Sequence, residues 1–465
     1  MIVATEMKKK MKKKKKKKKK KSNWGKIKNR GLKTLCDKMY QIMSQCIRQP
    51  VYCLSEIVGF SDMLLNESVG EDLQNNVRVK MSEYVTKSNN KYKVIRYDKE
   101  MLAPDIILTT GLLRSVIINN KNRVVSFAPP KSVSYDSFVN KNPEKSDSIV
   151  AEEFVEGTMI NVFWDETSGL SGSWEIATRN TVGAEVSFFK CKEKTPTFRE
   201  MFLEAAKKNN LELNMLNPMY CYSFVLQHPE NRIVVPFNSA QLYLVEVYEI
   251  VQTEGGVVNI FPLDLNIVKE IGYWNTTSLR FPQVYEFTKY EDLKEKYASM
   301  NTSYEILGVV IKNKATCERC KIRNPVYEYV RHLRGNQPKS QYQYLELRKE
   351  GKVGDFLKFY PENKKDFSYF RDKLHDFTNA LYKNYISCYI KKDRPLKEFP
   401  DHFRTHMFHI HKLYTDELKP KNDYVNNTVV INYVNELHPS LQMYSMNACL
   451  RKRRVDFIKV DSTMD

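Results

Sequence analysis

The sequence contains no apolar run long enough to cross a bilayer as a helix. No apolar core follows the N-terminal lysines, so they do not resemble a secretory signal peptide. The nine cysteines are odd in number and scattered in spacing, which indicates a reducing compartment rather than a disulfide framework. These absences argue against a membrane-spanning or secreted protein and favour the cytoplasm.

Acidic residues are also fewer than basic ones. Against 75 Lys and Arg there are 55 Asp and Glu, which gives a net charge of +20. Thirteen positive charges belong to Lys8–Lys10 and Lys12–Lys21, so the remainder carries +7. A basic chain favours an anionic partner such as nucleic acid. Because so dense a lysine run repels itself, residues 1–25 are predicted to be disordered, either as a polyanion-binding arm or as a tract under little constraint.

The length of 465 residues is sufficient for two or three domains. Residues 26–90 are predicted to form a helical segment, since apolar residues recur at helical spacing over 27–48. Strand and turn patterns dominate residues 91–335, and helical spacing dominates residues 336–465. The predicted helices are 197–209, 264–272, 289–299, 367–385, 404–414 and 428–437.

The segment from Ile149 to Asp165 reads IVAEEFVEGTMINVFWD. An apolar run, a glycine and an alternating run predict a strand, a tight glycine turn and a second strand. Further strands are predicted at 92–97, 114–118, 124–127, 173–178, 220–226, 232–235, 242–250, 305–312 and 320–323.

Six motifs occur in an order that resembles the phage RNA-repair ligases, a branch of the covalent nucleotidyltransferases. They are the strand that bears Arg114 and leads to FAPPK at 127–131, FVEG at 154–157, IATRN at 176–180, FVLQHPENRIV at 224–234, LGVV at 307–310, and KIR at 321–323 followed by Tyr327. Each motif is weak by itself, but the ordered set is specific. The C-terminal region is similar to the helical tail of the RNA-ligase-like proteins of large cytoplasmic DNA viruses, asfiviruses included.

The resemblance implies an α+β fold. Residues 91–335 would form a nucleotidyltransferase (ATP-grasp-like ligase) domain of antiparallel sheets around a cleft, and residues 336–465 an all-helical C-terminal domain. In the family a lysine amine attacks the α-phosphate of ATP, AMP passes to an RNA 5′-phosphate, and the RNA 3′-hydroxyl displaces it. The first step needs a neutral lysine and carboxylates that hold divalent metal ions. ATP and Mg²⁺ are therefore expected only if the chain is active. RNA is the expected partner, no membrane is, and protein partners are not indicated.

This sequence departs from the family at the residues that carry the chemistry. The lysine position holds Phe154, the two glutamate positions hold Val225 and Leu307, and the aspartate position holds Glu156. The nearest upstream lysine, Lys145, lies in a predicted loop too far from this motif to substitute. No catalytic residue and no metal ligand are therefore assigned, and an inactive adenylation site is favoured.

The cations that would face phosphate are kept. The resemblance assigns nucleotide or phosphate binding to Arg114, Arg179, Lys321 and Arg323. This combination favours an RNA-ligase-like protein of a large DNA virus, degenerate at the adenylation site, that still binds RNA or nucleotide. Two alternatives stay open: an active ATP-dependent RNA ligase in RNA repair, and a structural or virion interaction protein on a ligase fold. The expected location is the host cytoplasm, with packaging in the virion as a further expectation.

Two short patterns have the spacing of metal ligands. Cys317 and Cys320 lie in a predicted hairpin loop with no second Cys or His pair nearby, so ordinary thiols are expected. His402 and His406 are four residues apart on a predicted helix or its approach, with His409 and His411 beyond, but no His-Glu-x-x-His motif occurs. A solvated or RNA-facing histidine patch is expected there.

Overall fold

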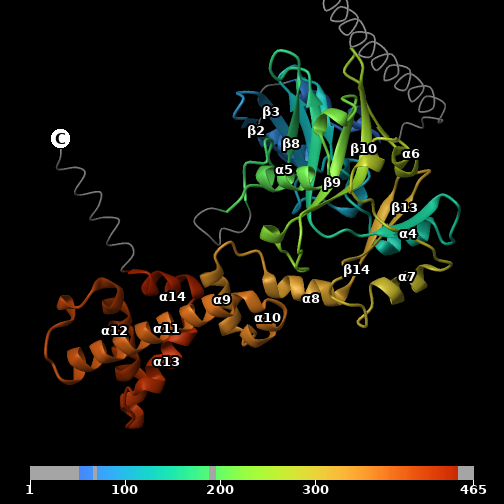
Figure 1. Cartoon of the computed structure of the whole chain (residues 1–465). Coiled ribbons are helices and arrows are strands. Elements are labelled where there is room, and N and C mark those ends of the chain that lie inside the picture. The colour runs from blue at the N-terminus through green and yellow to red at the C-terminus, as the bar shows by residue number, and fades with distance from the viewer. Residues whose placement is uncertain (1–51, 66–70, 188–194, 449–465) are drawn as a thin grey trace, which may run out of the picture.

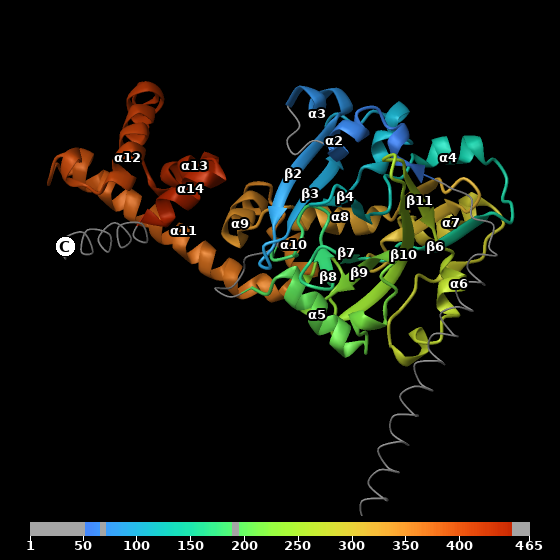
Figure 2. The ribbon, with the colours of Figure 1, turned by 90° about the horizontal axis from the view of Figure 1, so that it is seen from above.

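The computed structural model describes residues 52–65, 71–187 and 195–448 (Figure 1). The lysine-rich segment 1–25 and the helix predicted over 27–48 lie outside these residues. Within the described ranges, no helix has both the length and the hydropathy needed to span a membrane. A body of sheets is followed by a helical part that projects to one side of it (Figures 1 and 2). The predicted order of antiparallel sheets and then helices is confirmed.

The largest sheet has six strands, all antiparallel. Its order is β1 (Tyr52–Cys53), β11 (Val258–Pro262), β10 (Gln241–Gln252), β9 (Tyr220–Gln227), β7 (Thr158–Asp165) and β8 (Ser173–Ala177). One face packs against α5 (Phe198–Lys208), whose N-terminus Thr197 closes with a capping box to Glu200. The other face is covered by a second sheet. Because β9 is buried on both faces, its sequence is nearly all apolar rather than alternating.

The second sheet is an antiparallel meander of β2 (Val79–Val85), β3 (Lys91–Tyr97), β4 (Val116–Asn119) and β5 (Val124–Phe127). Two short helices, α2 (Phe60–Leu65) and α3 (Glu71–Val77), precede it. Helix α2 packs on this sheet through Phe60 and Met63. The prediction that residues 26–90 form a helical segment is wrong for β2, because that strand gains a full ladder of pairs with β3 that its local pattern does not reveal.

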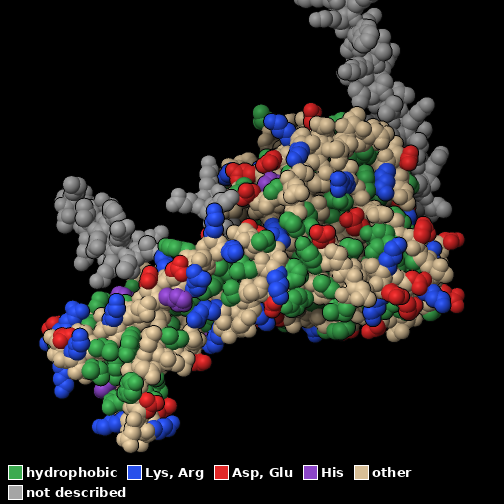
Figure 3. Space-filling view, turned by 60° about the horizontal axis from the view of Figure 1, so that its bottom comes forward, with side chains coloured by type: hydrophobic (Ala, Val, Ile, Leu, Met, Phe, Trp, Pro, Cys, Tyr) green, Lys and Arg blue, Asp and Glu red, His purple; other side chains and the backbone are tan. Residues whose placement is uncertain are grey.

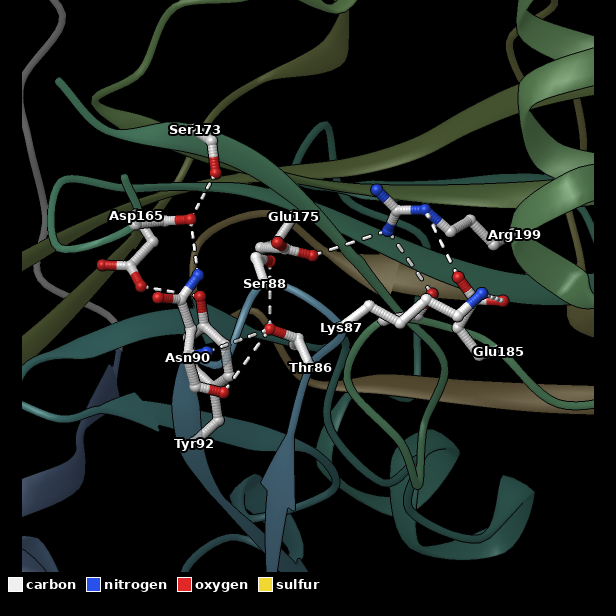
Figure 4. A network of polar contacts seen from close by, with 12 residues as sticks. Thr86, Lys87, Ser88, Asn90, Tyr92, Asp165, Ser173, Glu175, Glu185 and Arg199 are labelled. Carbon is white, nitrogen blue, oxygen red and sulfur yellow. Dashed lines mark hydrogen bonds and ion pairs between the residues drawn. The ribbon is translucent and has the colours of Figure 1, made fainter. Parts of the chain in front are cut away.

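Polar contacts join the β2–β3 hairpin to the β7–β8 hairpin (Figure 4). The carboxylate of Asp165, at the end of β7, is fully buried and accepts from the Tyr92 hydroxyl at 2.7 Å and from the Asn119 amide at 3.0 Å. Lys87 in the β2–β3 turn pairs with Glu185 at 3.0 Å. Since a buried carboxylate is stable only when its acceptor capacity is used, this network fixes the two sheets against each other.

The third sheet has the order β12 (Val284–Tyr285), β6 (Ile149–Glu153), β13 (Gly308–Asn313) and β14 (Arg319–Arg323), again antiparallel. Helices α4 (Tyr135–Lys141) and α7 (Tyr290–Tyr297) cover one of its faces. Strands β6 and β7 are consecutive in the chain but belong to different sheets. The residues 154–157 between them are therefore a crossover from one sheet to the other, not the tight turn of a hairpin.

The strand predicted at 232–235 is absent. Three hydrogen bonds run from the backbone amides of Val234 and Val235 to the carboxylate of Glu156, at 2.8 to 3.2 Å. Val234 is buried in the core of the helical part. The apolar pattern of this segment therefore reflects a docking contact and not a strand pair.

The helical part contains α8 (Pro325–Arg334), α9 (Ser340–Lys349), α10 (Val353–Phe359), α11 (Lys364–Tyr385), α12 (Asp401–Leu413), α13 (Asn427–Glu436) and α14 (Pro439–Met446). These helices share one apolar core, against which Leu307 and Ile233 of the sheet body also pack. Helix α8 runs along the sheet body and leads into the rest (Figures 1 and 2). A small helix, α6 (Leu265–Lys269), packs on the six-stranded sheet.

The prediction of a solvated histidine patch is wrong for His406. Its side chain is buried, and its two ring nitrogens contact the Tyr433 hydroxyl and the Ser445 hydroxyl, each at 2.9 Å. Burial lowers the pKa of His406, so this ring is part of a packed core.

Candidate functional site: a cationic cavity between two sheets

A cavity of about 290 Å³ lies where the six-stranded sheet and the β6–β13–β14 sheet diverge. The ends of β6 and β14, the crossover 154–157, the middle of β9 and the start of α8 all contribute to its wall. A second cavity of about 230 Å³ adjoins it and shares Glu152, Glu246, Lys312 and Arg319. The larger cavity is close to the size of a small-ligand pocket.

Two glycines permit the close backbone approaches that shape the cavity. Gly157 ends the crossover with a φ of +142°, and a Cβ there would lie 2.5 Å from the Leu226 carbonyl oxygen. Gly308 begins β13 with a φ of +134°, and a Cβ there would lie 2.1 Å from the Ile322 carbonyl oxygen. Both positions therefore exclude any side chain, for steric as well as conformational reasons.

The apolar residues at the altered family positions meet at this cavity. Phe154, Val225 and Leu307 all line it. Val225 is buried in a small cluster with Val155 and Tyr243, and Leu307 packs against the core of the helical part. At the two positions where the resemblance would place carboxylates, packed apolar side chains therefore form the cavity wall.

The fourth altered residue, Glu156, is buried and serves as a bridge between elements. Its carboxylate accepts from the Val234 and Val235 amides and is hydrogen-bonded to Tyr327 of α8. Burial raises the pKa of Glu156 to about 7, because desolvation outweighs the hydrogen bonds that favour the charged form. The side chain therefore joins the crossover to the segment 232–235 and to the helical part.

Three basic side chains from two segments of the chain line the cavity. Arg114 precedes β4, whereas Lys321 and Arg323 alternate along β14 and so share one face of that strand. The Lys321 ammonium nitrogen lies 4.3 Å from the centroid of the Phe154 ring, and the Arg323 guanidinium lies 5.9 Å from it. Three of the four predicted phosphate-binding residues are therefore brought together over the phenylalanine that occupies the lysine position.

The fourth predicted residue, Arg179, does not line this cavity. Its guanidinium lies 4.9 Å from the centroid of the Tyr97 ring. Its charge is close enough to Arg114 to depress the pKa of that residue further, after the larger effects of burial and of Arg319.

Arg319 lines the cavity although sequence reasoning missed it. It is buried, donates to the Pro130 carbonyl and lies 3.7 Å from Glu246. The signal was present in the chain, because residues 319, 321 and 323 alternate along one strand and must point to the same face.

The two lysines of the cavity have opposite surroundings. Lys312 pairs with Glu152 and with Glu246 at 2.7 Å each, and although burial opposes it, these carboxylates raise its pKa. Lys321 has no hydrogen bond or ion pair with another described residue. Burial and the neighbouring cations Arg319, Arg114 and Arg323 lower its pKa well below that of an ordinary lysine.

The residues with metal-ligand spacing do not assemble a site in the described ranges, where no three His, Cys, Asp or Glu side chains cluster suitably for a metal ion. Cys317 and Cys320 are free thiols, the first half-buried and the second buried. Lys145 lies outside the cavity, 3.8 Å from Glu286 and over the ring of Phe287.

Among curated proteins, the RNA ligase of Rhodothermus phage RM378 is 25% identical to this chain over 353 residues, which are 68% of this chain and 74% of that ligase. The chain is a homologue of a phage RNA ligase. The resemblance to RNA-ligase-type nucleotidyltransferases expected from the six motifs is thereby confirmed. No protein-family model matches the sequence.

Solved structures of RNA ligases have a weaker likeness to this RNA ligase homologue. An archaeal ATP-dependent RNA ligase covers 69% of the chain and 82% of its own, at 9% identity and a TM-score of 0.36. A Naegleria gruberi RNA ligase mutant with ATP and Mn covers 43% of the chain at 11% identity and a TM-score of 0.29, and the match spans only 57% of that ligase. Likenesses this low carry no argument about the site.

Proposed function

We propose that this RNA ligase homologue binds the phosphate of a nucleotide or of an RNA end in the cationic cavity, and that residue 154 carries no nucleotide. The observation that carries the proposal is the convergence of Arg114, Lys321 and Arg323 on one cavity wall beside Phe154. A phenylalanine has no nucleophilic atom, so the position is degenerate for covalent chemistry while the surrounding cations are retained.

The charge balance of the cavity supports an anionic ligand. Lys321 has no carboxylate partner among the described residues, and Arg323 pairs only with the half-buried Glu328, at 3.1 Å. Cations brought together in a partly buried cavity are costly unless an anion neutralises them. Guanidinium groups bind phosphate oxygens by charge-assisted hydrogen bonds, which makes phosphate the chemistry of choice.

On one face of the molecule, the basic side chains do not gather into a single patch. Figure 3 shows Lys and Arg side chains spread over this face of the sheet body and of the helical part, interspersed with Asp and Glu. We therefore place phosphate recognition in the cavity and assign the surrounding surface a weaker, steering contribution.

The test is salt-dependent binding of 5′-phosphorylated RNA, measured by fluorescence anisotropy. Because the positive charge of the lysine run would also attract RNA, chains with and without residues 1–21 are compared. The double variant Lys321→Ala with Arg323→Ala should bind more weakly and should flatten the log–log salt slope by about one to two units. Lys145→Ala, a lysine outside the cavity, is the matched control. An unchanged affinity and slope in the double variant would rule out this cavity as the RNA site and favour a structural role.

We also propose that the protein acts in the cytoplasm of a virus-infected host, where its free cysteines stay reduced, and that it is packaged in the virion. Cys53, Cys221, Cys317, Cys320 and Cys388 are unpaired in the described part of the chain. Mass spectrometry of purified virions and of cytoplasmic fractions tests this placement.

A further inference from the structure

Among the residues that the structure describes, the amine of Lys321 in this cavity has no anionic partner. Lys321 on β14 pairs in the strand ladder with Val310 on β13, and Lys312 pairs with Arg319. The two lysines are therefore on paired strands of one sheet. Lys312 is held by two carboxylates, whereas the Lys321 nitrogen is in contact with an aromatic face.

Each carboxylate that lines the cavity interacts with a group other than Lys321. Glu152 and Glu246 bind Lys312, and Glu246 also lies near Arg319. Glu153 accepts from the Gln283 backbone amide, and Glu156 accepts from the amides of residues 234 and 235.

The charged groups that act most strongly on Lys321 are cations, and its nitrogen lies over an aromatic ring. Arg319 and Arg323 come from its own strand, Arg114 from the approach to β4, Lys131 from the segment after β5, and the Phe154 ring from the crossover. These four cations and burial lower the pKa of Lys321 well below the ordinary value. The face of the Phe154 ring opposes this in part, because it attracts the ammonium form.

A neutral amine in an anion-attracting cavity is a nucleophile. An ordinary lysine with a pKa of about 10.4 is unprotonated in only about 1 molecule in 2,500 at pH 7. A desolvated lysine beside other cations is unprotonated far more often and attacks electrophiles that those cations attract. A phosphoric anhydride is an electrophile of this kind, and the same cations would stabilise the charge that develops on it.

We propose that Lys321, rather than residue 154, takes a nucleotidyl group from a nucleoside triphosphate. The lone pair of Nζ attacks the α-phosphorus and a nitrogen–phosphorus bond forms. The bond from that phosphorus to the bridging oxygen breaks, pyrophosphate leaves with the electron pair, and the displaced N–H proton passes to water. The divalent ion would enter the cavity already bound to the triphosphate. The inference rests on the proposed binding of a nucleotide phosphate in this cavity.

The experiment incubates the full-length protein with α-³²P-ATP and Mg²⁺ at pH 7 to 8, followed by denaturing electrophoresis. A phosphoramidate survives alkali and is cleaved by acid, and fragment mapping by mass spectrometry locates the modified lysine. Lys321→Arg keeps the positive charge but has no usable lone pair, so it should lose at least 90% of the label while it still binds ATP. Lys145→Arg, the same exchange at a lysine outside the cavity, is the matched control and should keep the label.

The outcomes separate this inference from the proposed function. Label on Lys321 that is lost in Lys321→Arg supports both. ATP binding without any covalent label overturns the inference and leaves the binding function standing. Label that maps to another lysine, or that persists in Lys321→Arg, also overturns it. No ATP binding and no label overturn the inference, and the RNA-binding measurement with the Lys321→Ala, Arg323→Ala variant then decides the proposed function.

Discussion

The crossover 154–157 and the strand β14 border the same cavity, yet they have kept very different chemistry. In the crossover, Phe154 presents an aromatic ring to the cavity, and the carboxylate of Glu156 accepts hydrogen bonds from backbone amides. In β14, alternate residues are all basic and point toward the cavity. One wall is thus formed by packed side chains and a hydrogen-bonded carboxylate, whereas the other carries a row of positive charges.

Each wall depends on a glycine that no other residue can replace, which gives the largest expected effect. Gly308→Ala would place a Cβ 2.1 Å from the Ile322 carbonyl oxygen at a φ of +134°, and Gly157→Ala would place one 2.5 Å from the Leu226 carbonyl oxygen. We expect each variant to lose about 4 kcal/mol of unfolding free energy, the range of severe core disruptions. Denaturant unfolding followed by circular dichroism measures this.

The control for the glycine variants is Gly272→Ala, where an added Cβ meets no atom within 4 Å. It should change the unfolding free energy by less than about 1 kcal/mol. If Gly308→Ala were as mild as this control, β13 and β14 could move apart at little cost in free energy. The close approach at Gly308 would then not be needed to hold the cavity wall.

The next effect concerns the crossover and its buried carboxyl. The pKa of Glu156 is raised from 4.5 to about 7 in the folded state, so its contribution to stability is fully present below pH 4.5 and is lost as the pH rises through 7. The difference is on the order of 3 kcal/mol between pH 4.5 and pH 8. Glu156→Gln, which cannot ionise, should remove that pH dependence.

The measurement for this prediction is the difference in unfolding free energy between Glu156→Gln and the parent at several pH values. Only the difference is informative, because other groups titrate in both proteins. The variant should gain stability relative to the parent as the pH rises from 5 to 8. A difference that does not vary with pH would mean that Glu156 is ionised at all these values.

The sequence predicted the strands whose residue pattern is local. It failed where a contact with a distant segment of the chain determines the structure. Short runs rich in apolar and aromatic residues placed β3, β5 and β8 within one or two residues, because each run carries several side chains that are buried in the core. The sequence pattern could not show that the Glu156 carboxylate accepts hydrogen bonds from the backbone amides of residues 234 and 235. Nor could it show that β6 and β7 belong to different sheets. Both facts depend on contacts between segments far apart in the chain.

The candidate site was only partly visible from the sequence for the same reason. The ordered motifs placed Arg114, Lys321 and Arg323 in one cavity, but Arg179 lies over Tyr97 instead. The motifs were also uninformative about the state of the Lys321 amine. That state depends on burial, on four neighbouring cations and on the commitment of each nearby carboxylate to another partner.

A smaller effect tests the cationic wall. Lys131 is exposed but close enough to Lys321 to lower its pKa. Lys131→Glu would exchange that repulsion for attraction and should move the pH at which Lys321 is half labelled upward by about one unit. Lys145→Glu, outside the cavity, is the control and should leave the profile unchanged. An unmoved profile in Lys131→Glu would mean that solvent screens this pair completely.

The smallest effect concerns the aromatic surface beneath the amine. The Phe154 ring faces the Lys321 nitrogen at 4.3 Å and stabilises its ammonium form, a contact worth about 0.5 to 1 kcal/mol. Phe154→Leu removes the ring face and keeps an apolar side chain. It should therefore lower the pH of half labelling by about 0.4 to 0.7 units, from that same energy, while the label remains on Lys321. The pH profile of labelling, with fragment mapping at each end, measures this. Abolished labelling with intact folding and ATP binding would assign Phe154 an indispensable positioning role, and the contrast between the two walls would not hold.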